Sequence, residues 1–200
     1  MLENAIADAL NEEESVKNSV FEGETLTGTN AEKAEFEDCA FIGCRFENCD
    51  FSKAYFANVK FSNCRFKDCT FAKSFWKNSE FKEVESGKCD FSKSKFKDCI
   101  LTASEFVYAA FAETVWENCK TDKAKMVKSG FSEVKFKKTR FHGTDFTDSD
   151  FFGTPLKGMD FSDCQITGIT ISDSAWELRG MKINAAQAAE LARLLGVIIV

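Results

Sequence analysis

The feature that most constrains this chain is a phenylalanine at every fifth position. The run "CDFSKAYFANVKFSNCRF", which starts at Cys49, has phenylalanine at Phe51, Phe56, Phe61 and Phe66. An amphipathic helix repeats its apolar face every 3.6 residues and a half-buried strand repeats every two, so neither element keeps these side chains on one side. The period therefore excludes an ordinary helix or strand as the main unit of the fold.

The five-residue register extends along most of the sequence. Counted from Phe21, large apolar centres recur through Trp176 and include all but two of the 22 phenylalanines. Only Ala31, Ser86 and Thr121 lack a large apolar group at a centre. The position two residues before each centre is usually small, and all nine cysteines occupy it. A chain that points two of every five side chains inward must coil and stack on itself, because one unit alone has no surface to bury against.

The unit small-x-Phe-polar-x, as in "CRFEN", "CDFSK" and "TDFTD", resembles the repeat of the pentapeptide-repeat family. The resemblance covers residues 16–183. It implies an all-β solenoid, a right-handed quadrilateral parallel β-helix with four repeats in each coil. Lysines at positions 33, 53, 73 and 93 recur at the same place in every fourth repeat, which agrees with a coil of that length. Around Ser86 and Thr121 the sequence leaves two alternatives open, a local bulge or a thinly packed core.

Both ends of the sequence differ from the repeat. Residues 1–15 place Leu2, Ile6 and Leu10 on one helical face, which predicts a short helix over the first coil. Residues 184–200 begin with Asn184 and Gln187 at capping-box spacing and continue with good helix formers, which predicts a C-terminal capping helix.

The C-terminal segment carries more apolar residues than one helix needs to cover one coil. We expect this excess to form a symmetric homodimer. The predicted dimer residues are Leu191, Leu194, Leu195, Val197, Ile198, Ile199 and Val200.

Composition and charge argue against membrane and nucleic-acid binding. The N-terminal "MLENAIADALNEEE" lacks a basic leader, and no stretch approaches the roughly 20 apolar residues that span a bilayer, so we expect a cytoplasmic protein without membrane contact. The net charge is −6, although residues 61–145 carry 12 acidic and 17 basic side chains (+5). A nucleic-acid-binding domain usually carries a dominant stripe of basic side chains. The negative net charge of this chain argues against such a stripe, so the sequence predicts no direct contact with nucleic acid.

The sequence shows no pattern that carries catalysis. The cysteines do not have the close paired spacing of zinc ligands, and they are interpreted as small buried thiols. Cys49, Cys69 and Cys89 would stack within reach of a disulfide, but parallel inward side chains rarely have the torsion it requires. His142 is the single histidine and lies on an outward position. We therefore predict no enzyme, no catalytic residues, no cofactor and no metal.

The ending "LKGMDFSDCQITG...LRGMKINAAQAAELARLLGVIIV" resembles the Qnr and MfpA group within the family. That resemblance implies a dimer that imitates duplex DNA, binds bacterial type II topoisomerase (DNA gyrase or topoisomerase IV) and modulates it or protects it from quinolones or related toxins. The chain departs from the group in its basic middle and in lacking a long inserted loop. The expected contact residues are the acidic side chains near the C-terminal end: Asp145, Asp148, Asp150, Asp160, Asp163, Asp173 and Glu177.

Two other functions remain open from the sequence. The rod could be an interaction scaffold that binds another protein through its basic middle or through outward apolar residues such as Tyr55, Phe75 and Phe152. Its regular phenylalanine usage also fits a designed or idealised rod with no partner.

Overall fold

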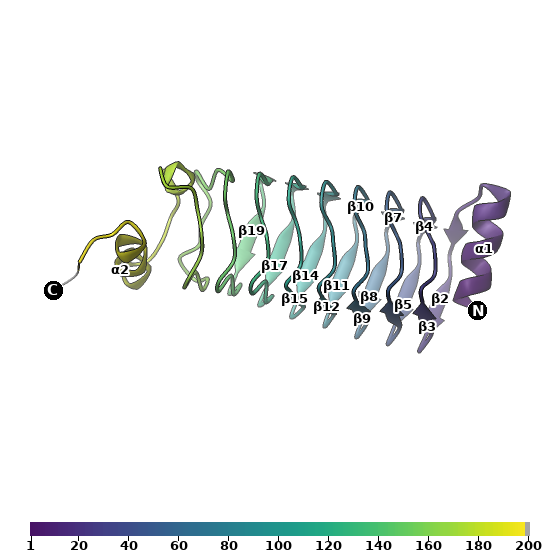
Figure 1. Ribbon diagram of the computed structural model, residues 1–200. Helices are drawn as coiled ribbons and strands as arrows, with labels where there is room; N and C mark the ends of the chain where they lie inside the picture. The colour runs from purple at the N-terminus through teal and green to yellow at the C-terminus, as the bar shows by residue number, and fades with distance from the viewer. Residues whose placement is uncertain (199–200) are drawn as a thin grey trace.

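The computed structural model describes residues 1–198 and shows a rod built by a right-handed parallel β-helix (Figure 1). Each strand pairs with the equivalent strand of the next coil, four repeats later in the sequence. On one face, for example, Phe36 pairs with Phe56, and Phe56 pairs with Trp76. The predicted fold class and coil length are therefore confirmed.

Each coil has four faces, and three of them carry sheets. The first face consists of β1 (Val16–Lys17), β4 (Glu35–Glu37), β7 (Tyr55–Ala57), β10 (Phe75–Lys77), β13 (Lys95–Lys97), β16 (Val115–Glu117) and β18 (Lys135–Lys137). The second face consists of β2 (Val20–Glu22), β5 (Ala40–Ile42), β8 (Lys60–Ser62), β11 (Glu80–Lys82), β14 (Ile100–Thr102), β17 (Lys120–Asp122) and β19 (Arg140–His142). The third face consists of β3 (Thr25–Thr27), β6 (Arg45–Glu47), β9 (Arg65–Lys67), β12 (Glu85–Gly87) and β15 (Glu105–Val107).

The fourth face is joined by single bridges, such as those from Asp50 to Thr70 and from Thr70 to Asp90. At most corners the chain turns through a residue with positive φ, two positions after the centre. Lys53 (φ 59°) and Asn58 (φ 55°) are examples. The left-handed conformation turns the chain onto the next face there. Glycine and asparagine adopt it readily, and many lysines also occupy these corners.

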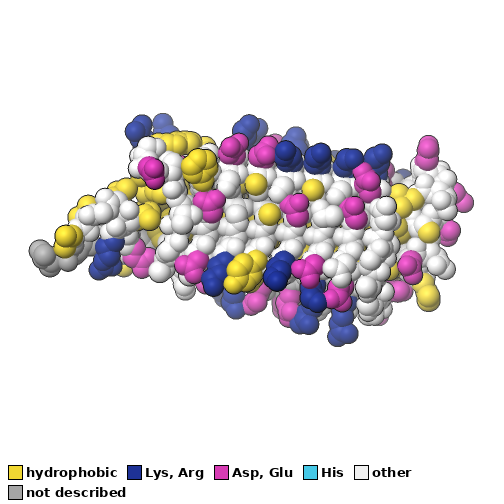
Figure 2. Space-filling model, viewed as in Figure 1, with side chains coloured by type: hydrophobic (Ala, Val, Ile, Leu, Met, Phe, Trp, Pro, Cys, Tyr) yellow, Lys and Arg dark blue, Asp and Glu magenta, His cyan; other side chains and the backbone are white. Residues whose placement is uncertain are grey.

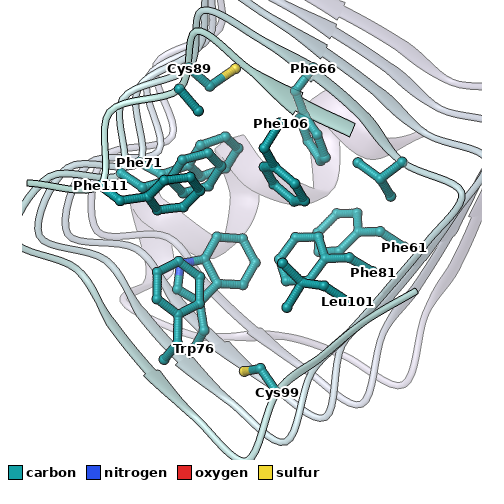
Figure 3. Close-up of a cluster of buried hydrophobic side chains, with 14 of the residues drawn as sticks. Phe61, Phe66, Phe71, Trp76, Phe81, Cys89, Cys99, Leu101, Phe106 and Phe111 are labelled. Carbon is teal, nitrogen blue, oxygen red and sulfur yellow. The ribbon is translucent and has the colours of Figure 1, made fainter. Parts of the chain in front are cut away.

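The core is a set of aromatic columns that run along the rod axis (Figure 3). On the first face, the ring of Phe56 stacks between those of Phe36 and Trp76, with centroid distances of 5.1 and 3.8 Å. Within one coil, neighbouring rings meet edge to face, as Phe61 and Phe66 do at 5.3 Å. Both arrangements are favourable for aromatic pairs, so the repeat places one ring per face in a geometry that suits its neighbours.

Ser86 and Thr121, the two centres for which a bulge was an alternative, both lie within the sheets. Ser86 lies in β12 and Thr121 in β17, and both are buried without a bulge. Thr121 shares a hydrogen bond with Thr144 at 2.6 Å, whereas the hydroxyl of Ser86 has no partner within the described part of the chain. The thin-core alternative is therefore correct.

All nine cysteines are free and buried, as predicted. Most of their thiols donate to backbone carbonyls, and Cys44, for example, donates to Phe21 in the preceding coil at 3.3 Å. Burial raises the pKa of Cys164 to about 12. These thiols serve as small core residues.

The N-terminal helix α1 (Leu2–Glu12) covers the first coil. Leu2 and Ile6 are fully buried, and Leu10 is half-buried beside them. At the other end, sheet pairing on the first face stops after β18. Pro155 occupies the next donor position there, and proline has no N–H to continue the ladder.

Candidate interaction surface at the C-terminal end

The repeat loses its register in the last coil. Asp160 bridges to Lys182, whereas a continued repeat would pair it with Gly180. The extra residues form a turn and the short 3-10 helix η1 (Trp176–Leu178). As a result Trp176 is 38% exposed, so its sequence-based assignment to an inward centre is wrong.

Glu177 takes an inward position instead and is fully buried. Its carboxylate accepts hydrogen bonds from the backbone N–H groups of Gly153 (3.0 Å) and Ser172 (3.1 Å) and from the Ser172 hydroxyl (2.9 Å). Burial alone would raise the pKa of Glu177, but these hydrogen bonds outweigh it and lower the pKa. Glu177 is therefore a structural carboxylate, and its predicted role as an exposed contact residue is corrected.

Three of the predicted acidic residues lie within one coil. Asp145 is on the third face, Asp148 is at the next corner and Asp150 is on the fourth face. Asp145 accepts from the backbone N–H of Thr147 at 2.9 Å, and Asp150 accepts from the backbone N–H of Phe152 at 3.1 Å. Local hydrogen bonds therefore hold two of these carboxylates in fixed directions on either side of the corner that carries Asp148.

The other three exposed carboxylates lie near them in the chain but on different faces. Asp160, on the second face, accepts from the backbone N–H and hydroxyl of Ser162, and these bonds lower its pKa. Asp163 contacts His142 and accepts from the backbone N–H of Gly143 at 3.2 Å. Asp173 is exposed in the turn before η1. The structure therefore spreads the predicted acidic residues around the end of the rod, with one group on the third and fourth faces.

Helix α2 (Ala185–Leu194) follows the last coil and begins with the predicted capping box between Asn184 and Gln187. The Gln187 side chain also donates to the carbonyls of Phe161 and Cys164, both at 2.7 Å, so it satisfies backbone groups at the open end of the coil. Leu191 is buried against the same end, which corrects its assignment to a dimer interface.

The remaining apolar residues of this segment are exposed. Leu194 and Leu195 lie at the end of α2, and Val197 and Ile198 follow it. Ile199 and Val200, also predicted as dimer residues, lie outside the described residues. With Trp176 and Phe152, these side chains are six of the eleven exposed large hydrophobic residues within residues 1–198, and hydrophobic atoms gather toward the C-terminal end in Figure 2.

Comparisons with known proteins fit this architecture. A family profile described as "Pentapeptide repeat region" matches residues 15–91 and 89–171. The chain belongs to the pentapeptide-repeat family. A search of curated proteins finds no significant match.

Among solved structures, a trypsin-treated form of QnrB1, described as a plasmid-mediated fluoroquinolone resistance protein, is similar over 93% of this chain and 98% of its own, with a TM-score of 0.60 and 18% identity. HetL from the cyanobacterium Nostoc, a pentapeptide-repeat protein involved in heterocyst differentiation regulation, matches with a TM-score of 0.43 and 10% identity, over 90% and 92% of the two chains. At these identities the likeness to QnrB1 shows a shared fold.

Two absences within residues 1–198 bear on other kinds of site. No helix in that range is long and apolar enough to cross a membrane. The same range contains no cluster of three or more His, Cys, Asp or Glu side chains placed to hold a metal ion.

Proposed function

We propose that this protein is a non-enzymatic, DNA-imitating ligand of a bacterial type II topoisomerase. The observation that carries the proposal is the set of outward carboxylates at Asp145, Asp148 and Asp150, two of them held by local hydrogen bonds, on a rod of regular width. A partner that binds a duplex presents cationic side chains to phosphates, and carboxylates spaced along a rod of stacked strands can occupy similar places. The shared fold with QnrB1, described as a fluoroquinolone resistance protein, supports this choice of partner.

The fourth face adds to the acidic surface. It carries Asp50, Asp90 and Asp150 in one column, and the residues between them in that column are Thr70, Ala110 and Gly130, whose side chains are short or absent. At about 4.8 Å per coil, Asp50 and Asp90 are about 10 Å apart, close to three phosphate steps along one DNA strand. The spacing of Asp50 and Asp90 therefore fits a sparse imitation of a phosphate backbone, and Asp145 and Asp148 add carboxylates beside Asp150 at the C-terminal end.

The proposed complex contains two copies of the chain. The exposed side chains of Leu194, Leu195, Val197 and Ile198 form an apolar end that a second copy could cover. A symmetric pair would place the two acidic ends side by side at its centre. Light scattering after size exclusion tests this: the dimer should dissociate when Leu195→Ser and Ile198→Ser are combined, and an unchanged mass would remove this part of the proposal.

The main experiment is a supercoiling assay with gyrase, with and without a quinolone. We expect the protein to alter supercoiling in a way that weakens with added salt, because exposed charges are screened. The test variant combines Asp145→Asn, Asp148→Asn and Asp150→Asn. Its matched control makes the same charge change on helix α1, with Glu3→Gln, Asp8→Asn and Glu12→Gln.

The two variants separate a specific contact from a general effect of charge. Loss of the effect in the C-terminal variant alone would support the proposal. Equal loss in both variants would contradict the placement of the contact. No effect of the wild-type protein at any concentration would contradict topoisomerase binding and favour a scaffold for another partner.

A further inference from the structure

Within the described residues, the first face carries five lysines that form no salt bridge, although Glu117 pairs across the strands with two of them, Lys97 and Lys137. In β13, Lys95 and Lys97 flank the inward Phe96, and in β18, Lys135 and Lys137 flank the inward Phe136. Side chains alternate across a strand, so all four lysines point away from the core. Lys77 in β10 pairs directly with Lys97 and extends the same column.

Several cations elsewhere on the rod form salt bridges between coils. Arg65 and Lys67 in β9 lie within 4.0 Å of Glu85 and Glu47, and Lys125 contacts Glu105 at 2.6 Å. Within residues 1–198, no carboxylate lies within 4.0 Å of any of the five first-face lysines. Glu117 is the single acidic residue between Lys97 and Lys137 in their column.

Like charges that are directly paired across strands repel each other. Here Lys77 faces Lys97, and on the second face Lys120 of β17 faces Arg140 of β19. A neutral or acidic residue at one member of each pair would relieve the repulsion without disturbing the core. The arrangement is therefore suited to an anion that comes from outside the chain.

A groove at the corner between the first and second faces continues this surface. It has a volume of about 830 Å³, and its cationic lining consists of Lys120, Lys138, Arg140 and Lys182. The groove opens beside Gly158, the corner residue that follows Lys138 and has no side chain to fill the space. Asp160 and Asp163 also line the groove, but they are engaged by Ser162 and by His142.

We propose that this basic face, the five first-face lysines together with the four cations of the groove, binds the phosphate backbone of duplex DNA without reading its sequence. This surface extends from the sheet of the first face around the corner to the sheet of the second face, and within residues 1–198 no helix or loop projects from either sheet to enter a groove of the duplex (Figure 1). Lysine contacts to phosphate carry affinity but no sequence information. From the negative net charge, the sequence predicts no contact with nucleic acid. The fold revises that expectation, because it brings basic residues from successive coils together on one side of the rod.

A duplex suits the face better than a single strand. Single-strand binders stack bases on exposed aromatic rings. The aromatic pair on this face, Tyr55 and Phe75, is half-buried, and the two rings stack on each other at 5.6 Å. The ammonium group of Lys95 lies over the Phe75 ring at 5.9 Å, so little ring surface remains for a base.

The test is fluorescence anisotropy of a labelled 20-base-pair duplex of random sequence, titrated with the protein at several salt concentrations and without any topoisomerase. We expect binding at 50 mM salt that weakens steeply as salt is raised. The test variant combines Lys95→Gln, Lys135→Gln and Lys137→Gln. It should bind at least tenfold more weakly, with a salt slope about 2.7 smaller if each lysine neutralises one phosphate.

Two controls make the result specific. The first combines Lys67→Gln, Lys88→Gln and Lys125→Gln, the same charge change on and beside the third face, and it should bind within twofold of the wild type. The second replaces the three first-face lysines by arginine, and it should retain binding. Circular dichroism of every variant checks that the rod is folded.

Three outcomes would overturn the proposal. They are no binding by the wild type at 50 mM salt, equal weakening by both glutamine variants, and competition by polyglutamate as effective as that by unlabelled duplex at equal charge. Because the assay contains no topoisomerase, its result does not depend on the proposed function.

Discussion

The coils before Pro155 and the coil after it follow the repeat to different extents. In the earlier coils, most centres carry rings that pack along the rod axis, and strand partners are four repeats apart, as for Phe56 and Trp76. In the last coil the partner of Asp160 is displaced along the chain to Lys182, Trp176 points outward and a buried carboxylate replaces an apolar centre. The comparison teaches that a strict repeat builds a uniform rod, and that distinctive surface features arise where the repeat is interrupted.

The largest expected difference between the two regions is the change in the free energy of unfolding when a phenylalanine is replaced by alanine. Phe56→Ala should lower the free energy of unfolding by about 4 kcal/mol, because it removes a fully buried ring that stacks with Phe36 and Trp76. The matched substitution Phe152→Ala removes a ring that is 53% exposed and should change it by less than about 0.5 kcal/mol. Urea denaturation measures both. Similar losses for the two variants would contradict the assignment of core and surface.

The next effect concerns the interrupted coil itself. Glu177→Gln should lower stability at neutral pH by about 2 kcal/mol, because a buried charged acceptor loses strength in its hydrogen bonds to Gly153 and Ser172. The pKa of Glu177 is lowered in the folded state, so its contribution is present above its unfolded pKa and is lost as pH falls through the folded pKa.

Thermal unfolding from pH 7 down to pH 3 tests this prediction. The gap between the wild type and Glu177→Gln should narrow as the pH falls below about 4.3, the usual pKa of a glutamate. A gap that stays constant over this range would show that the carboxylate is not charged in the folded protein.

The smallest predicted effect lies within the regular region. Ser86 occupies a centre between Phe66 and Phe106, and its buried hydroxyl has no hydrogen-bond partner in residues 1–198. Ser86→Ala should therefore raise the free energy of unfolding by about 1 kcal/mol, since an unsatisfied polar group is removed. Thr121→Ala makes a useful comparison and should be destabilising, because the Thr121 hydroxyl shares a hydrogen bond with Thr144. Denaturation midpoints would show the opposite signs, and equal signs would contradict this prediction.

The sequence predicts the regular region well because one rule governs it. The five-residue period identifies the inward rings from Phe21 to Phe161, and the small position before each centre identifies the buried cysteines. The capping box of α2 could also be predicted from the sequence, since it depends only on the local spacing of Asn184 and Gln187.

The interrupted coil was harder to predict, because Trp176 falls in the five-residue register and is a large apolar residue, as most centres are. One signal was present. If the period continued, Arg179 would take the small inward position before Met181, and a buried arginine has no place in such a core. The sequence also showed a basic middle, but it did not predict which face carries the lysines, because they come together only when successive coils are stacked.

Tryptophan fluorescence tests the contrast between the two regions most directly. Trp76 and Trp116 are fully buried, whereas Trp176 is exposed. A variant with Trp76→Phe and Trp116→Phe keeps Trp176 alone, and Trp176→Phe keeps the two buried rings. We expect iodide to quench the first variant strongly, with red-shifted emission, and to leave the second nearly unquenched. If Trp176 were as protected from iodide as the other two tryptophans, the repeat would continue into the last coil and the contrast between the two regions would be wrong.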